Sequence, residues 1–211
     1  MKRRQALAVL MSGLAVAAGV RAQGYPSKPI RVIVGYTAGG AVDIVARAVS
    51  QQLQLSLGQP IIVENRPGAG TNIALRALID SPADGYTLML TANAIAANMS
   101  LYQPPPYDLA RDITPISLVG RVPVVLAVNA QSEYKTLGDL IAAAKAKPGS
   151  VNYASPGNGS TPHLAVELFE RASGISLTHV PYKGGAQAIT DVMGGHVQMV
   201  AVNALEEQLG A

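Results

Sequence analysis

Hydroxyl-bearing residues and glycines gather in one short stretch of the chain, Tyr153–His163. The stretch follows a β-type run and precedes an amphipathic helix, for which Thr161 is the expected N-cap and Gly174 the expected stop signal. Such a loop carries free backbone N–H groups at the positive end of a helix dipole, an arrangement typical of anion-binding sites. An ordinary polar turn between a strand and a helix is the alternative interpretation.

A second stretch of the same kind lies near the start of the chain, at Tyr36–Gly40. The apolar, β-branched run before it predicts a buried strand over 30–35, and apolar residues at helical spacing predict a helix over 41–57 that ends at Gly58. Asp43 lies in the first turn of that helix, where it favours the helix dipole and can brace the loop. The Gly-x-Gly-x-x-Gly spacing of dinucleotide-binding loops is missing here.

Strands and helices alternate along the rest of the chain, which predicts an α/β fold with mainly parallel sheets. Ligands of such sheets bind beyond the carboxyl ends of the strands, where both Gly-rich loops fall. We expect a first α/β domain over residues 23–121 and a second, incomplete one over residues 122–211. The other expected strands are 61–64, 87–91, 113–119, 124–128, 150–154, 177–180 and 197–202, and the proline-rich stretch 102–108 is expected to be an extended loop.

The N-terminus reads as a secretory signal peptide over residues 1–22. Three basic residues at positions 2–4 precede an uncharged run from Ala6 to Val20, and a small-x-small site at Val20–Ala22 predicts cleavage near Ala22 and export. A membrane anchor is the weaker alternative, because the run is shorter than the roughly 20 residues that a span needs.

The charge balance and the absence of cysteine exclude several classes of function. Without the four basic residues of the leader (Lys2, Arg3, Arg4 and Arg21), 12 of the 16 basic residues remain against 13 acidic ones, so the formal net charge falls from +3 to −1. No general basic field for nucleic acid is left. Because the chain contains no cysteine, thiol catalysis and thiolate metal sites are excluded.

Motifs in both halves of the chain resemble those of one family. This is the Bug family, the extracytoplasmic solute receptors associated with tripartite tricarboxylate transporters. The similarity spans about residues 25–202. Its motifs are Ala38–Gly40 with Asp43 and Arg47, Val63–Gly70, Asp84–Leu88, Tyr107–Asp108, Asn152–Ser155, Gly157, Gly159–Ser160, His163–Ala165 and His179–Gly184.

This resemblance implies a two-domain, Venus-flytrap periplasmic-binding-protein fold in which the C-terminal part of the usual fold is missing. It also implies a monomeric periplasmic receptor that is not an enzyme and needs no cofactor or metal. The receptor holds a small carboxylate (a di- or tricarboxylate or related organic acid) between two Gly-rich loops and delivers it to membrane transporter subunits. Carried over to this sequence, the ligand-binding residues are Tyr36, Thr37, Ala38, Gly39, Gly40, Asp43, Thr91, Asn93, Ser155, Gly157, Gly159, Ser160, Thr161 and His163.

Two positions depart from the family pattern. The first loop usually reads Pro-Phe-Pro where this chain has Gly35-Tyr36-Thr37, so Thr37 has an N–H group that proline lacks. The last strand usually carries acidic residues where this chain has Gln198 and Val202, and the second of these positions normally faces the ligand. The acidic side chains that could bind a cationic group of the ligand are therefore replaced by uncharged ones at both positions.

Two other functions are alternatives to a receptor. A hydrolase would use Ser155 or Ser160 as nucleophile and His163 as base, but no Gly-x-Ser-x-Gly elbow surrounds either serine. The interpretation as a nucleotide-binding domain is supported by the Gly-rich turns alone. The three histidines, His163, His179 and His196, match no compact metal-site spacing.

Overall fold

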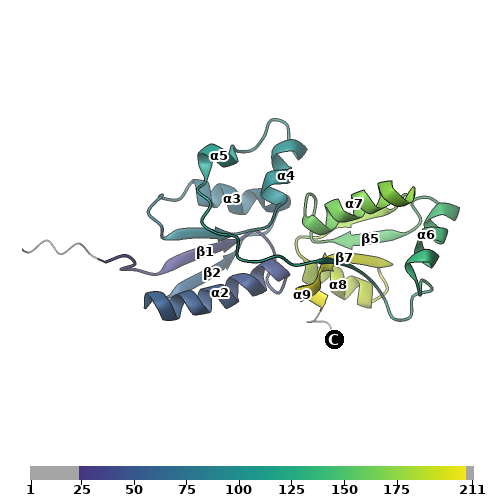
Figure 1. Ribbon diagram of the computed structural model, residues 1–211, viewed down its shortest axis with the longest axis horizontal. Coiled ribbons are helices and arrows are strands. Elements are labelled where there is room, and N and C mark those ends of the chain that lie inside the picture. Colours follow the sequence, from purple (N-terminus) through teal and green to yellow (C-terminus); the bar gives the residue numbers. More distant parts are fainter. Residues whose placement is uncertain (1–23, 208–211) are drawn as a thin grey trace, which may run out of the picture.

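Two separate β-sheets, each covered by helices, form two lobes that lie end to end (Figure 1). The computed structural model describes residues 24–207, so the expected signal peptide lies outside the described residues. The first sheet has the order β2-β1-β3 and is parallel throughout. Its strands are β1 (Ile30–Val34), β2 (Ile61–Asn65) and β3 (Thr87–Leu90).

The central strand of the first lobe is β1, whose apolar run is almost wholly buried, as its composition predicts. Helix α2 (Ala41–Leu57) covers one face of the sheet and α3 (Asn72–Ile79) covers the other (Figure 1). The bounds of α2 agree with the helix expected over 41–57. Gly58 ends the helix in the left-handed conformation, with φ of 65°, because glycine has no Cβ to oppose it.

The chain between β3 and the second lobe departs from the expectation. Two helices, α4 (Ala94–Leu101) and α5 (Leu109–Asp112), follow β3, and the short 3-10 helix η1 (Ala69–Thr71) precedes α3. The predicted strand over 113–119 is wrong. A β-branched sequence forms a strand only where a partner strand completes its hydrogen bonds, and no described strand pairs with this segment.

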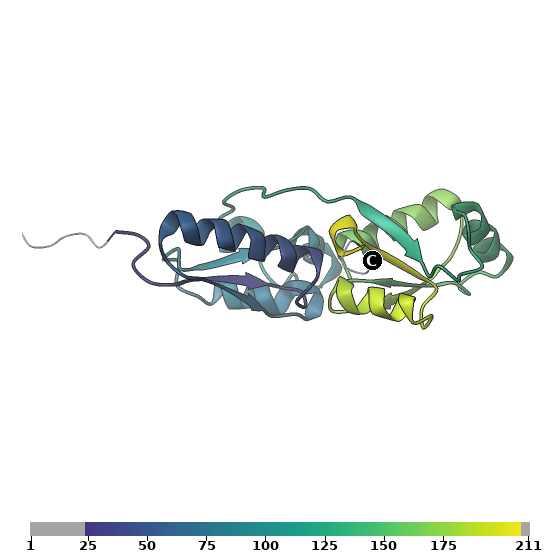
Figure 2. The ribbon, with the colours of Figure 1, turned by 90° about the horizontal axis from the view of Figure 1, so that it is seen from below.

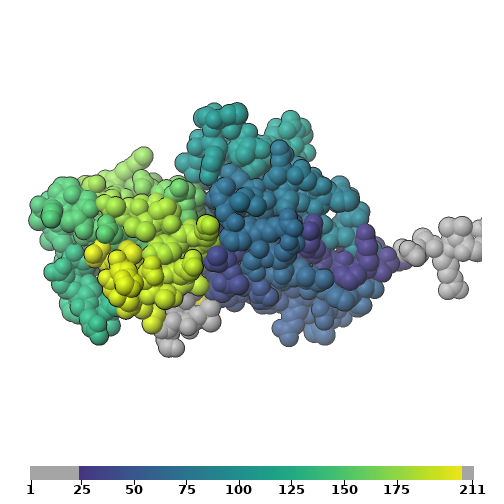
Figure 3. Space-filling view, turned by 180° about the vertical axis from the view of Figure 1, so that it is seen from behind, coloured from purple at the N-terminus to yellow at the C-terminus, as the bar shows by residue number. Residues whose placement is uncertain are grey.

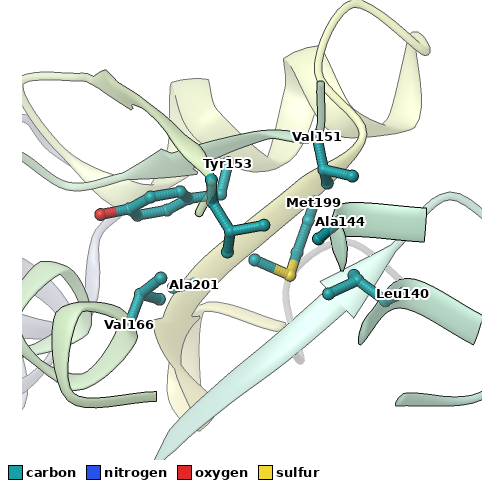
Figure 4. Packing of buried hydrophobic residues seen from close by; sticks show 8 residues of the cluster. Leu140, Ala144, Val151, Tyr153, Val166, Met199 and Ala201 are labelled. Carbon is teal, nitrogen blue, oxygen red and sulfur yellow. The ribbon is translucent and has the colours of Figure 1, made fainter. Parts of the chain in front are cut away.

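The second sheet has the order β4-β7-β5-β6, with only β4 antiparallel to its neighbour. Side chains alternate across it, so Tyr153 and Met199 contribute to one core cluster and Ala154 and Val200 to another. Figure 4 shows the first cluster, in which residues of α6 and α7 pack on the sheet. The elements are β4 (Val124–Val128), α6 (Leu137–Ala146), β5 (Asn152–Ser155), α7 (Thr161–Ser173), β6 (Thr178–Pro181), α8 (Gly185–Met193) and β7 (Met199–Asn203).

Two segments of the described chain lie where the lobes meet. An extended connection runs from α5 to β4 along one side of the molecule (Figure 2). After β7, the short helix α9 (Ala204–Glu207) lies at the junction, where it contacts β7 and α8 of the second lobe and α2 of the first. The predicted domain boundary, between residues 121 and 122, falls in the first connection and stays a prediction. Among the described residues, no helix is both long and apolar enough to cross a membrane.

Candidate functional site

The two Gly-rich loops meet where the lobes are in contact. One loop, residues 35–40, joins β1 to α2, and the other, residues 156–160, joins β5 to α7. The N-cap of α7 is Ser160 rather than Thr161, because the Ser160 hydroxyl accepts a hydrogen bond from the backbone N–H of His163. The expected stop at Gly174 is confirmed, with the residue in the left-handed conformation.

The two lobes touch each other (Figure 3), and hydrogen bonds join them at these loops. The backbone N–H of Thr37 donates to the carbonyl of Lys183 at 3.1 Å. This is the N–H group that a proline at the same position would lack. The Thr161 hydroxyl forms a second bond across the junction, to the side-chain oxygen of Asn93. These two bonds join the loops of one lobe to the other lobe.

Glycines permit this close approach at two further places. A Cβ added to Gly184 would lie 1.9 Å from the Thr37 hydroxyl oxygen, and one added to Gly159 would lie 2.8 Å from a methyl carbon of Leu101. Gly159 also has φ of 73°, a conformation that side chains rarely adopt. Both glycines therefore face the opposite lobe rather than a ligand-sized space.

A small cavity lies at this junction, with about 10 Å³ of room for the centres of water molecules. This is about the space of one water molecule. No charged side chain lines the cavity, so an anion there would depend on neutral hydrogen-bond donors and helix dipoles. The lining residues are Tyr36, Val42, Ala92, Pro156, Ser160, Thr161, Pro162 and Asn203.

Only three of the expected ligand-binding residues line this cavity, namely Tyr36, Ser160 and Thr161. Asn203 was not among the expected residues, although it lies at the carboxyl end of β7, where ligands of parallel sheets bind. Val202, the position that the resemblance placed toward the ligand, is fully buried in a core cluster instead. The other lining residues that were missed are Val42, Ala92, Pro156 and Pro162.

Several loop N–H groups already have partners within the protein. Those of Thr37 and Gly39 donate to Lys183 and Asp43, and those of Gly157, Gly159 and Ser160 donate to acceptors in their own lobe. Within residues 24–207, the N–H groups of Ala38, Gly40 and Thr161 have no such partner. Thr91 and Asn93 follow β3, and Asn93 bonds to Thr161 across the junction.

Asp43 braces the first loop and is 2% exposed. Its carboxylate accepts hydrogen bonds from the Gly39 N–H at 2.9 Å, the Arg47 guanidinium at 2.9 Å and the Asn65 amide at 2.8 Å. Burial acts to raise the pKa of Asp43, but the hydrogen bonds from Arg47, Gly39 and Asn65 outweigh it and lower the pKa. These contacts occupy the carboxylate, so Asp43 positions the loop rather than faces the cavity.

The serine–histidine pairing of the hydrolase alternative does not form. Ser155 is fully buried, and its hydroxyl oxygen lies 2.7 Å from Nε2 of His179 rather than near His163. Ser160 contacts His163 only through the backbone N–H of that residue. The His163 ring instead accepts a hydrogen bond from the Gly159 N–H at its Nδ1 atom. His179 was not among the expected site residues, and its link to Ser155 spans 24 positions that no local motif connects.

The fold and the facing loops define the class of protein, a two-domain periplasmic binding protein of the Venus-flytrap type. Residues 45–208 match the tripartite tricarboxylate transporter family receptor, and the chain belongs to this family. The family and its structural neighbours are solute-binding receptors rather than enzymes.

Similar proteins agree with this assignment. The chain is 42% identical over 193 residues to protein BugT of Bordetella pertussis, covering 90% of this chain and 59% of BugT. The chain thus spans about 59% of the length of this relative. A structure of an R. palustris protein with adipate has a TM-score of 0.84 and 34% identity, covering 88% of this chain and 62% of that one. The structure of MatC from Rhodopseudomonas palustris with bound malate has a TM-score of 0.79 and 28% identity, and the match covers 87% of this chain and 63% of MatC.

Proposed function

We propose that this protein is a periplasmic receptor that binds a small carboxylate between its two Gly-rich loops. One observation carries the proposal. The loops of the two sheets face each other across a junction cavity without a charged side chain, at the N-terminal ends of α2 and α7. Helix N-termini and free N–H groups favour an anion, and the malate and adipate in the related structures have the matching chemistry.

The carboxylate is held by donors from both lobes. The N–H groups of Ala38 and Gly40 on the first loop, and of Thr161 on the second, are free to donate. The Ser160 hydroxyl and the Asn203 amide add polar groups, while Val42, Ala92 and the prolines supply apolar contacts for the carbon skeleton. The remaining expected residues support these two loops, as Asp43 does for the first.

Binding and closure of the lobes are linked in this proposal. The junction cavity accepts about one water molecule, and a carboxylate group is larger, so the ligand enters while the lobes are apart and holds them slightly further apart than they are in this structure. Donors of both loops reach the ligand only when the lobes approach each other. The ligand therefore favours the closed form by the free energy of the additional hydrogen bonds that it makes there. Export to the periplasm, a monomeric state and delivery to transporter subunits in the membrane complete the proposed role.

The proposal is tested by thermal denaturation with a panel of ligands. Adipate, malate and citrate are compared with nucleotides and with adipamide, which keeps the carbon skeleton of adipate but has no charge. We expect at least one carboxylate to raise the unfolding temperature in a concentration-dependent way, because a ligand at 100 times its Kd stabilises by about 2.7 kcal/mol. Equal stabilisation by adipamide and adipate, or stabilisation by nucleotides alone, would contradict the proposal.

A further inference from the structure

Three aromatic rings are stacked beneath the second loop. The imidazole of His179 lies between the ring of Tyr153, with centroids 4.8 Å apart, and the imidazole of His163, with centroids 4.2 Å apart. Tyr153 is fully buried at the centre of the second lobe, as Figure 4 shows. The stack therefore connects the core of this lobe to the first turn of α7.

Each imidazole has a hydrogen-bond contact on the loop side. A backbone N–H can only donate, so Nδ1 of His163 is the acceptor for the Gly159 N–H at 3.2 Å. The Ser155 hydroxyl oxygen accepts from the Gly157 N–H at 3.1 Å. The same hydroxyl oxygen lies 2.7 Å from Nε2 of His179 and 3.4 Å from the carbonyl oxygen of Gly157. Because the first distance is shorter, we assign the hydroxyl proton to the hydrogen bond with His179. Both rings thus act as acceptors.

An imidazole accepts a hydrogen bond only while one of its nitrogens is unprotonated. Two protonated rings at this separation would also repel each other, because the charges would lie face to face in a partly buried site. The groups that face the pair are Glu167 and Glu170 of α7 and the Tyr153 phenol of β5. Glu167 lies 3.6 Å from Nε2 of His163 and is 44% exposed, so water screens its charge.

We propose that His163 and His179 are positioning residues of the ligand site, which hold the 156–160 loop in place as a pair of neutral hydrogen-bond acceptors. Acid would remove both anchors, so the loop and the carboxylate site that it forms would be acid-sensitive. The consequence for ligand binding rests on the proposed function, whereas the consequence for the loop does not.

The direction of the pH effect follows from the two protonation states. Burial, together with the neighbouring His163, lowers the pKa of His179 to about 4, and burial also lowers the pKa of His163. A released ring returns toward its ordinary pKa of about 6.5, so the released loop binds more protons than the anchored one. The anchored state is therefore fully favoured above about pH 6.5 and loses stability as the pH falls toward 4.

A ligand-free experiment tests the loop itself. Amide resonances of Gly157 and Gly159 are followed by NMR from pH 7.5 to pH 3.5, beside the ring signals of the two histidines. We expect the amides to move with the same midpoints as the rings, below pH 6.5. Replacement of both histidines by glutamine should remove this response, because glutamine offers an acceptor that does not titrate. His196→Gln is the control, since His196 is exposed and outside the stack. Amides that stay unchanged while the rings titrate would overturn the inference.

A binding experiment separates the acceptor role from ring packing. With adipate as the probe at pH 7.5, His179→Gln should keep the affinity within about threefold of the parent, whereas His179→Phe, which keeps a ring but no acceptor, should weaken it at least tenfold. Equal affinities of the two variants would mean that only packing matters. If adipate binds to no version of the chain, the proposed function fails for this ligand, and the amide titration alone decides whether the histidines position the loop.

Discussion

Gly184→Val is expected to weaken carboxylate binding by about 100-fold, equivalent to about 2.8 kcal/mol, while both lobes stay folded. A Cβ at this position would lie 1.9 Å from the Thr37 hydroxyl oxygen, 3.1 Å from its Cβ and 3.2 Å from its backbone nitrogen. Rotation of the threonine relieves only the first contact. Because Gly184 has an extended φ of 169°, the backbone itself tolerates valine, and the effect comes from keeping the lobes apart.

Two further variants make this result interpretable. Gly120→Val is the matched control, since no heavy atom lies within 4 Å of a Cβ at that position. Thr37→Gly in the Gly184→Val background should recover part of the affinity by removing the obstructing side chain. Calorimetric titration with adipate measures the affinity, and circular dichroism checks the fold. Parental affinity in Gly184→Val would show that this approach of the lobes is not part of the bound state.

Asp43→Ala is expected to lower the free energy of unfolding by about 3 kcal/mol at neutral pH, because it leaves buried donors without their acceptor. The carboxylate joins the Gly39 N–H, Arg47 and Asn65, so its loss also frees the first loop. Urea denaturation of the parent and the variant measures the difference. Asp43→Asn is the control, because it keeps the volume and one acceptor oxygen and should cost less.

The stability that Asp43 contributes should also depend on pH in a defined direction. Its pKa is lowered in the folded protein, so the ionised form is the stabilising one. Its contribution is therefore complete above the ordinary aspartate pKa of about 3.9 and is lost as the pH falls through the lower folded value. A difference between parent and Asp43→Ala that stays the same from pH 7 to pH 2.5 would contradict this role of the carboxylate.

Local signals in the sequence could predict most of the fold. Apolar spacing and Gly58 predicted the bounds of α2, and α6 likewise starts with a local signal, the capping box of Thr136 and Asp139. The sequence did not predict the elements that depend on distant parts of the chain or that lack a capping residue. The segment 113–119 has the composition of a strand, but no described strand pairs with it. Helix α4 has no side-chain hydrogen bond at its N-cap, so no capping motif in the sequence predicts where it starts.

The candidate site, too, could be predicted from the sequence only in part. Both Gly-rich loops could be predicted, because a strand, a glycine turn and a helix are consecutive in the sequence. Which atoms remain free to bind could not be predicted, because this depends on how the lobes pack. The N–H of Thr37 is taken by Lys183, which is distant in the sequence, and Ser155 is paired with His179 rather than His163.

The shared carboxylate site is tested most directly by following the amide resonances of Ala38, Gly40 and Thr161 while adipate is added. If one carboxylate is held by both loops, all three resonances should shift along a single saturation curve that ends at one ligand per chain. The amides of Gln131 and Gly195, which line a separate hollow of the second lobe, should stay unchanged. Shifts confined to one loop, or different saturation curves for the two loops, would contradict a site formed jointly by the two lobes.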